Sequence, residues 1–224
     1  LEAAVQHVAV GGLRGKGGSA YEESIRVPLY VKDPTGAWAK DPDVVRTQLT
    51  SSVDFIALLM TLAQGDGSWR SNSKYSHIAN RFDMTALLKD PTAQGQDYVL
   101  HTTDEVAYEE SPRAFWADDP AVHVIAYRTG EGKVATYSHW NEVTTEILSD
   151  GQEAECYDYS TENGRIELEN VAVAGNTLYT TLNAQLTAAI DSDLRQPLPD
   201  SLKAAQKSAY FAYLYTHPKL SHVF

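Results

Sequence analysis

The sequence lacks the features that mark several large classes of protein. It has a single cysteine, Cys156, so no disulfide can form within the chain. No apolar run approaches the roughly 20 residues that a membrane-spanning helix needs. There is no basic excess: the formal net charge is −12, whereas nucleic-acid binding normally needs a basic surface. We therefore expect a soluble globular protein that binds neither nucleic acid nor membrane, with the compartment, cytoplasmic or periplasmic, left open.

Several catalytic motifs are also missing. A phosphate-binding P-loop needs a glycine five residues before its Gly-Lys pair and a Ser or Thr after it, but Val10 and Gly17 occupy those positions around Lys16. The sequence contains no Gly-x-Ser-x-Gly nucleophile elbow. Its seven histidines show neither HxH nor HExxH spacing, which argues against a self-contained zinc site. The sequence therefore has no P-loop and supports neither an α/β-hydrolase elbow nor a self-contained zinc site.

What the sequence does contain is a glycine-rich loop, GGLRGKGG over residues 11–18, with Lys16 inside it. Glycines allow a close approach of backbone or ligand, which suits a lysine that faces an anion pocket. A solvated lysine in a flexible turn is the alternative. Ser19 and Glu22 have the spacing of a capping box and predict a helix directly after the loop. The apolar run VPLYV, residues 27–31, then predicts a buried strand.

The segment GGLRGKGGSAYEESIRVPLYVKDPTG resembles the C-terminal active-site segment of the type I sulfatases, the arylsulfatase-like hydrolases of the alkaline phosphatase superfamily. The helix-like stretch LTSSVDFIALLMTLA and the late segment EAECYDYSTENGRIELENVA are similar to later parts of the same family. The residues that match the family pattern are Lys16, Tyr21, Glu22, Arg26, Val27 and Pro28 in the first segment, and Tyr157, Asp158, Glu169 and Asn170 in the late one.

The resemblance implies that this chain is the C-terminal portion of a sulfuric ester hydrolase. Lys16 would be the catalytic lysine that binds the sulfate of a small-molecule sulfate ester and offsets charge that develops on it. His7 is either a displaced substrate contact or an ordinary structural histidine. The family nucleophile, a formylglycine made in a Cys/Ser-x-Pro-x-Arg motif, works beside a divalent metal, calcium, held by oxygen ligands. Cys156 lacks the Pro and Arg of that motif.

We therefore expect no metal ligands and no nucleophile in these 224 residues, and no turnover by this chain alone. Both would belong to a missing N-terminal portion, which becomes the expected partner; the chain starts Leu1-Glu2, without the basic start of a signal peptide. The family also carries an Asp-Asn or Asp-His metal pair, and often a His-Gly, just before the lysine, whereas this chain has Val10 and no such Asp. Two alternatives stay open: a phosphate or phosphonate monoester hydrolase of the same superfamily, or a non-catalytic interaction or structural module with a degenerate site.

The expected fold class is α/β. Residues 1–95 would form the C-terminal end of the sulfatase-like α/β/α domain, with Lys16 at the carboxyl edge of a mainly parallel sheet that includes VPLYV. A helix near residues 51–64 has apolar residues around most of its circumference, which predicts burial on all sides. Residues 96–224 would form a smaller α+β subdomain with an antiparallel sheet of about four strands and C-terminal helices.

The C-terminal tail is rich in aromatic residues, with four aromatics between positions 210 and 215 and Phe224 at the end. A helix with that many aromatic residues cannot place all of them on one stripe. Aromatic residues are enriched in the centres of protein interfaces. The tail either docks on a neighbouring subunit, giving a homo-oligomer, or on the missing N-terminal portion, or it lies across the sheet of its own subunit.

Overall fold

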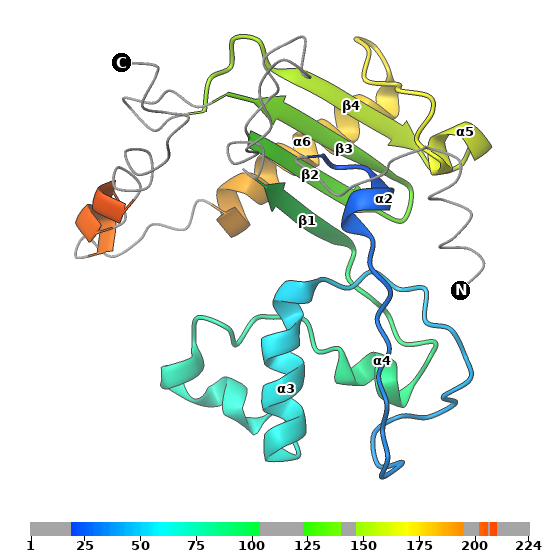
Figure 1. The fold of residues 1–224 in the computed structure, drawn as a ribbon, viewed down its shortest axis with the longest axis vertical. Helices are drawn as coiled ribbons and strands as arrows, with labels where there is room; N and C mark the ends of the chain where they lie inside the picture. The colour runs from blue at the N-terminus through cyan, green and yellow to red at the C-terminus, as the bar shows by residue number, and fades with distance from the viewer. Residues whose placement is uncertain (1–18, 104–122, 140–146, 195–201, 206, 210–224) are drawn as a thin grey trace, which may run out of the picture.

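The structure, a computed structural model, describes residues 19–103, 123–139, 147–194, 202–205 and 207–209 of the chain. At its centre is a four-stranded antiparallel sheet whose strands lie side by side in chain order (Figure 1). The strands are β1 (Tyr98–Thr103), β2 (His123–Thr129), β3 (Gly132–Ser138) and β4 (Glu153–Asp158). A mixed α/β class with an antiparallel sheet of about four strands is therefore confirmed.

The β2–β3 hairpin forms because two runs rich in β-branched and aromatic residues flank Gly130 and Glu131. Its register pairs Ala126 with Ala135, so side chains alternate between the two faces of the sheet. One face is apolar and includes Ile125 in β2 and Cys156 in β4. The opposite face mixes small apolar residues with charged ones, and this mixture decides what can pack there.

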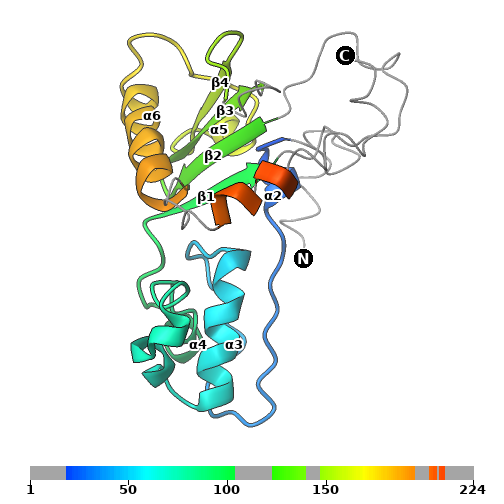
Figure 2. The same ribbon diagram turned by 90° about the vertical axis from the view of Figure 1, so that its left-hand side faces the viewer.

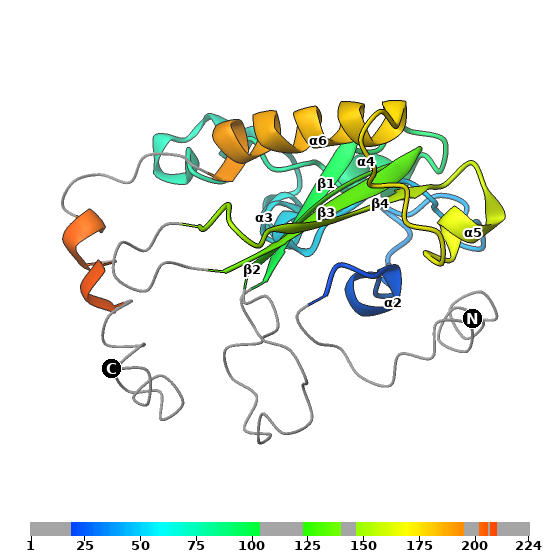
Figure 3. The same ribbon diagram turned by 90° about the horizontal axis from the view of Figure 1, so that it is seen from above.

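Helix α6 (Thr177–Ala189) covers the apolar face of the sheet. Asn176 caps it by accepting a hydrogen bond from the backbone N–H of Tyr179 at 2.9 Å. Leu182 and Leu186, each 2% exposed, pack against the strands and close the main core. The short helix α2 (Glu22–Ile25) lies on the other side of the sheet, so the sheet stands between the two helices (Figure 3).

A second group of helices lies below the sheet in Figure 1. Gly65 ends the longest of them with a φ of 83°, as the sequence predicts. Trp69, 2% exposed, centres this group and donates from Nε1 to the Thr61 hydroxyl at 2.9 Å. The elements are η1 (Ser52–Asp54), α3 (Phe55–Gln64), η2 (Ser68–Ser71), η3 (Ser73–Tyr75) and α4 (Thr85–Lys89).

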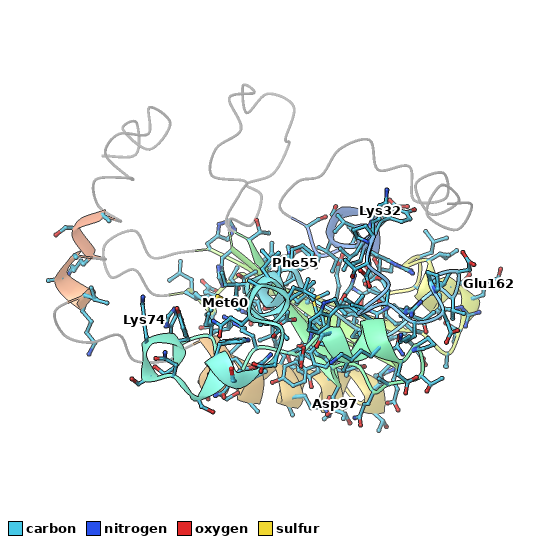
Figure 4. The ribbon with its side chains drawn as sticks, turned by 90° about the horizontal axis from the view of Figure 1, so that it is seen from below. Lys32, Phe55, Met60, Lys74, Asp97 and Glu162 are labelled. Carbon is cyan, nitrogen blue, oxygen red and sulfur yellow. The ribbon has the colours of Figure 1, made fainter. Side chains whose placement is uncertain are left out.

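The expected burial of α3 on all sides is wrong. Only Ala57, Leu58 and Thr61 of this helix are buried. Ile56 and Leu59 are 46% and 61% exposed, because η2 and α4 cover one side of the helix and leave the other open. Figure 4, seen from below, labels Phe55 and Met60 of this helix.

The prediction that VPLYV forms a buried strand is also wrong. Residues 27–31 run past α3 without any assigned strand (Figure 2), and Tyr30 is 75% exposed. The physical reason is that a strand needs a neighbour, and no other described residue forms a ladder with this segment. All three strand pairings among the described residues are antiparallel, so the expected parallel sheet is not found in this part of the chain.

Two further predictions concern the division into two parts and the C-terminal helices. The predicted division near residue 95 stays a prediction. In the region of the predicted C-terminal helices, residues 202–205 and 207–209 are helical and exposed, and the aromatic tail, residues 210–224, lies outside the described residues. Short elements complete the picture: α5 (Glu162–Arg165) follows β4, and a π-helical turn, η6 (Ile190–Leu194), follows α6. In the described ranges, none of the helices has the length and apolarity to cross a membrane.

Candidate functional site

The two predicted site residues, Lys16 and His7, lie outside the described residues. The structure begins at Ser19, three residues after Lys16, and α2 follows at once. The predicted capping box does not form: Tyr21 is the N-cap residue without a side-chain cap, and the Ser19 hydroxyl hydrogen-bonds the Ser24 hydroxyl at 2.9 Å. The start of α2 is therefore held in place by contacts other than a side-chain cap.

These contacts come from the sheet, and the first of them are made by Ala20. This residue is 1% exposed and packs against small side chains of β2 and β3, including Ala126 and Ala135. Its backbone carbonyl accepts a hydrogen bond from the ammonium of Lys133, and its backbone N–H donates to the Tyr137 hydroxyl at 3.4 Å. Small strand residues let the backbone come close enough for both contacts.

Glu22, the first residue of α2, is bound through both its backbone and its side chain. Its N–H donates to Oε2 of Glu167 at 2.8 Å. Its carboxylate oxygen Oε1 lies 3.3 Å from Nε of Arg128 and accepts from the Tyr159 hydroxyl at 3.3 Å. One of the free N–H groups at the start of a helix is thus satisfied by a residue 145 positions away in sequence.

A buried ion pair between Lys133 and Glu167 lies under these contacts. The Lys133 side chain is 1% exposed and the Glu167 side chain 5% exposed. Burial lowers the pKa of the Lys133 ammonium, while the adjacent Glu167 carboxylate acts in the opposite direction. Removing one partner of such a pair leaves a buried charge alone and typically destabilises a fold by about 3–5 kcal/mol.

Glu155 provides a second carboxylate on the same face of the sheet. Its Oε1 accepts from the Tyr21 hydroxyl at 2.9 Å, and its Oε2 accepts from the Tyr137 hydroxyl at 2.7 Å. Burial, with the Glu155 charge added to it, raises the pKa of both tyrosines. Both phenols therefore stay neutral donors at physiological pH and orient the carboxylate between them.

We call the strand and loop side chains that bind residues 20–22 the anchor cluster. Its members hold one another and the backbone of residues 20–22, so they fix a position and offer no evident nucleophile. Among the described residues, no group of three His, Cys, Asp or Glu side chains could hold a metal ion. The anchor cluster consists of Arg128, Lys133, Tyr137, Glu155, Tyr159 and Glu167.

The late segment of the sulfatase resemblance contributes to this region and to its support. Tyr157 is 3% exposed, and its ring centroid lies 6.2 Å from that of Tyr21. Asn170 binds the outer edge of β4: its Oδ1 accepts from the N–H of Cys156 at 2.9 Å, and its Nδ2 donates to the carbonyl of Ala154 at 3.2 Å. Glu169 is exposed. Asn170 therefore secures β4, whereas Tyr157 packs against the segment that follows the glycine loop.

Reasoning from the sequence missed the anchor cluster, although one signal was present. Glu155, Tyr157 and Tyr159 alternate along β4 and its end, which places all three on the face opposite Cys156. Lys133 and Tyr137 lie on that same face of β3. A strand face that carries charge and phenols indicates a polar partner, because buried polar groups must be hydrogen-bonded.

Three comparisons with known proteins identify no family for this chain. No family model matches the chain, and no curated protein and no solved structure matches it.

Proposed function

We propose that this chain is the C-terminal portion of a sulfatase-like hydrolase that cleaves sulfate esters. Residues 1–95 would be the end of its α/β/α domain and residues 96–224 its smaller C-terminal subdomain. Lys16 would bind the substrate sulfate, and His7 would be a second substrate contact. The sequence supports this through the Lys16, Tyr21, Glu22 and Arg26 pattern.

The observation that carries the proposal is the anchoring of residues 20–22. Ala20 lies four positions after Lys16, and four positions of extended chain span at most about 14 Å. The anchor cluster thus limits how far the lysine can lie from a fixed point on the sheet. A lysine in a flexible surface turn needs no buried ion pair next to its loop, whereas a lysine that must meet a sulfate oxygen does benefit from a fixed point.

In the proposed chemistry, Lys16 is a compact cation that binds one sulfate oxygen. Its charge would offset the negative charge that grows on the sulfuryl group in the transition state. Formylglycine and calcium would supply the nucleophile and the Lewis acid in the complete enzyme. The described residues do not fit either group, because they hold no metal-binding cluster and Cys156 lies inside the sheet. We therefore assign both to the N-terminal portion.

The same proposal gives the exposed segment 27–31 a partner. Val27, Leu29 and Val31 alternate with Pro28 and Tyr30 along the sequence, and each of the three is more than 40% exposed. The N-terminal portion would cover these apolar side chains. Its identity as sulfatase, phosphatase or phosphonatase depends on residues in that portion, so a Cys/Ser-x-Pro-x-Arg motif encoded upstream is the first point to check.

A non-catalytic module is the second candidate. It is favoured by Val10, which stands where the sulfatases often have a histidine, and by the lack of an upstream Asp before the loop. In that case the anchor cluster would hold a scaffold loop in place, and Lys16 would be dispensable for turnover.

Replacing Lys16 with alanine in the full-length protein separates the two candidates. Turnover of an aryl sulfate should fall by about 10²–10³-fold if the lysine stabilises transition-state charge. Lys32→Ala is the matched control, because this lysine follows the same segment, is exposed, and lies at the edge of the described side chains in Figure 4. Parallel assays with an aryl phosphate identify the ester class. Unchanged turnover in Lys16→Ala would contradict the proposal, as would sulfatase activity of the 224-residue chain by itself.

A further inference from the structure

Glu167 combines two unusual features. Its backbone φ is 58°, in the left-handed region that residues other than glycine seldom occupy. It also follows the end of α5, the position where glycine is most common, and its side chain is nevertheless 5% exposed. A glutamate at this position costs on the order of 1 kcal/mol or more in backbone energy, so the surrounding contacts must hold it there.

Those contacts use both oxygens of the carboxylate. Oε1 pairs with the Lys133 ammonium and accepts from the Tyr159 hydroxyl at 2.9 Å, and Oε2 accepts from the N–H of Glu22 at 2.8 Å. Lys133 continues to the carbonyl of Ala20. The pair therefore bonds the backbone of Ala20 and of Glu22, the two ends of the three-residue stretch that leads from the glycine loop into α2.

We infer that Glu167 and Lys133 are positioning residues: they fix residues 20–22, the segment from which the chain leads back to Lys16. The inference rests on the proposed function, because it gives a role to the loop that the proposal assigns to substrate sulfate. The two residues do not touch the expected substrate; they act through the backbone of residues 20–22, and they come from a part of the chain more than 110 residues beyond it.

Stability alone does not account for the arrangement. A buried ion pair that is replaced by apolar residues of similar volume often leaves a protein equally stable or more stable. A glycine in place of Glu167 would also relieve the backbone at φ 58°. The fold could therefore do without both charges, whereas the hydrogen bonds to Ala20 and Glu22 could not form without them.

The first test uses the 224-residue chain with both charges removed, Lys133→Met together with Glu167→Leu. Thermal unfolding should stay near that of the parent chain, because neither charge is left alone in the interior. Amide hydrogen exchange at Glu22 should become at least tenfold faster, while exchange at Ala126 in β2 stays unchanged. Tyr98→Phe is the control, since its hydroxyl binds Asp193 and not the anchor cluster. Unchanged exchange at Glu22 would overturn the inference.

The second test is a double-mutant cycle in the full-length protein on an aryl sulfate. The charge-free double variant should lower kcat/KM by about 100-fold, the loss typical of a small displacement of a catalytic group. In a Lys16→Ala background the same two substitutions should cause no further loss, because the group that they position is gone. Equal losses in both backgrounds would show a general structural role and overturn the inference.

The cycle also separates the two ideas. Lys16→Ala without effect refutes the proposed function, and the positioning role falls with it. Lys16→Ala with a large effect, beside a charge-free variant of full activity, refutes the positioning role and leaves the proposed function standing.

Discussion

A thiol reagent added to the folded chain at pH 8 should leave Cys156 unmodified, and the same reagent should modify it completely once the chain unfolds. Cys156 is the only cysteine, is 0% exposed, and lies in β4 within the core that α6 covers. Burial, with Asp158 nearby, raises the pKa of its thiol from 9.0 to about 11. The thiolate is the form that reacts.

The expected protection can be worked out from these values. At pH 8 a thiol with a pKa of 9.0 is roughly one-tenth ionised, and one with a pKa of about 11 is roughly one-thousandth ionised. Ionisation alone therefore slows the reaction about 100-fold. Because the sulfur has no exposed surface, labelling also requires opening of the sheet and α6, and its rate then follows the population of the open state.

The assay is the absorbance released by an aromatic disulfide reagent, recorded along a urea series. Stability should also fall as pH rises: the folded pKa lies above the unfolded one, so the contribution of this thiol is complete below pH 9 and is lost between pH 9 and about 11. That loss is on the order of 3 kcal/mol, and Cys156→Ala should remove it. Rapid stoichiometric labelling of the native chain would refute the packing of β4 under α6.

Three further substitutions test other parts of the fold. Leu186→Ala should lower the free energy of unfolding by about 2–5 kcal/mol in urea titrations, because it opens a cavity between α6 and the sheet; a change below 0.5 kcal/mol would contradict that packing. Gly132→Ala should destabilise by about 1–3 kcal/mol in the same assay, since its Cβ would lie 2.6 Å from the carbonyl oxygen of Tyr157. Gly130→Ala, with nothing within 4 Å, is its control. Leu29→Ser should change the melting temperature little, because this side chain is 45% exposed; a large drop would mean that residues 27–31 are buried.

The strands were predictable because their signal is local. Alternating β-branched and aromatic residues, interrupted by a Gly-containing turn, are sufficient to indicate the β2–β3 hairpin. The existence of α3 and its end at Gly65 were predictable for the same reason. Its burial was not, because apolar character shows that a side chain gains by burial and does not show that a partner is present. Ile56 and residues 27–31 are exposed because none of the residues that the structure describes covers them.

The candidate site was less predictable than the fold. The lysine-bearing loop stood out from its glycines, but its supporting contacts join Glu22 to Arg128 and Glu167, more than 100 positions away. The spacing of residues along the sequence does not indicate a contact over so many positions. Glu167 also has the backbone conformation of a glycine, so local propensity points away from the residue that is present. Residues whose local preference is overridden are those for which a role beyond folding is worth testing.

The side-chain amide of Asn170 affects whether the β4 edge of the sheet can pair with other molecules at high protein concentration. By bonding the N–H of Cys156 and the carbonyl of Ala154, it occupies groups on the outer edge of β4 that would otherwise be open to a strand from another molecule. The N–H of Val171 takes the carbonyl of Cys156 as well. The Asn170 side chain and the Val171 backbone thus block further strand pairing along β4. This protects the edge of the sheet from the strand-by-strand addition that leads to fibrils.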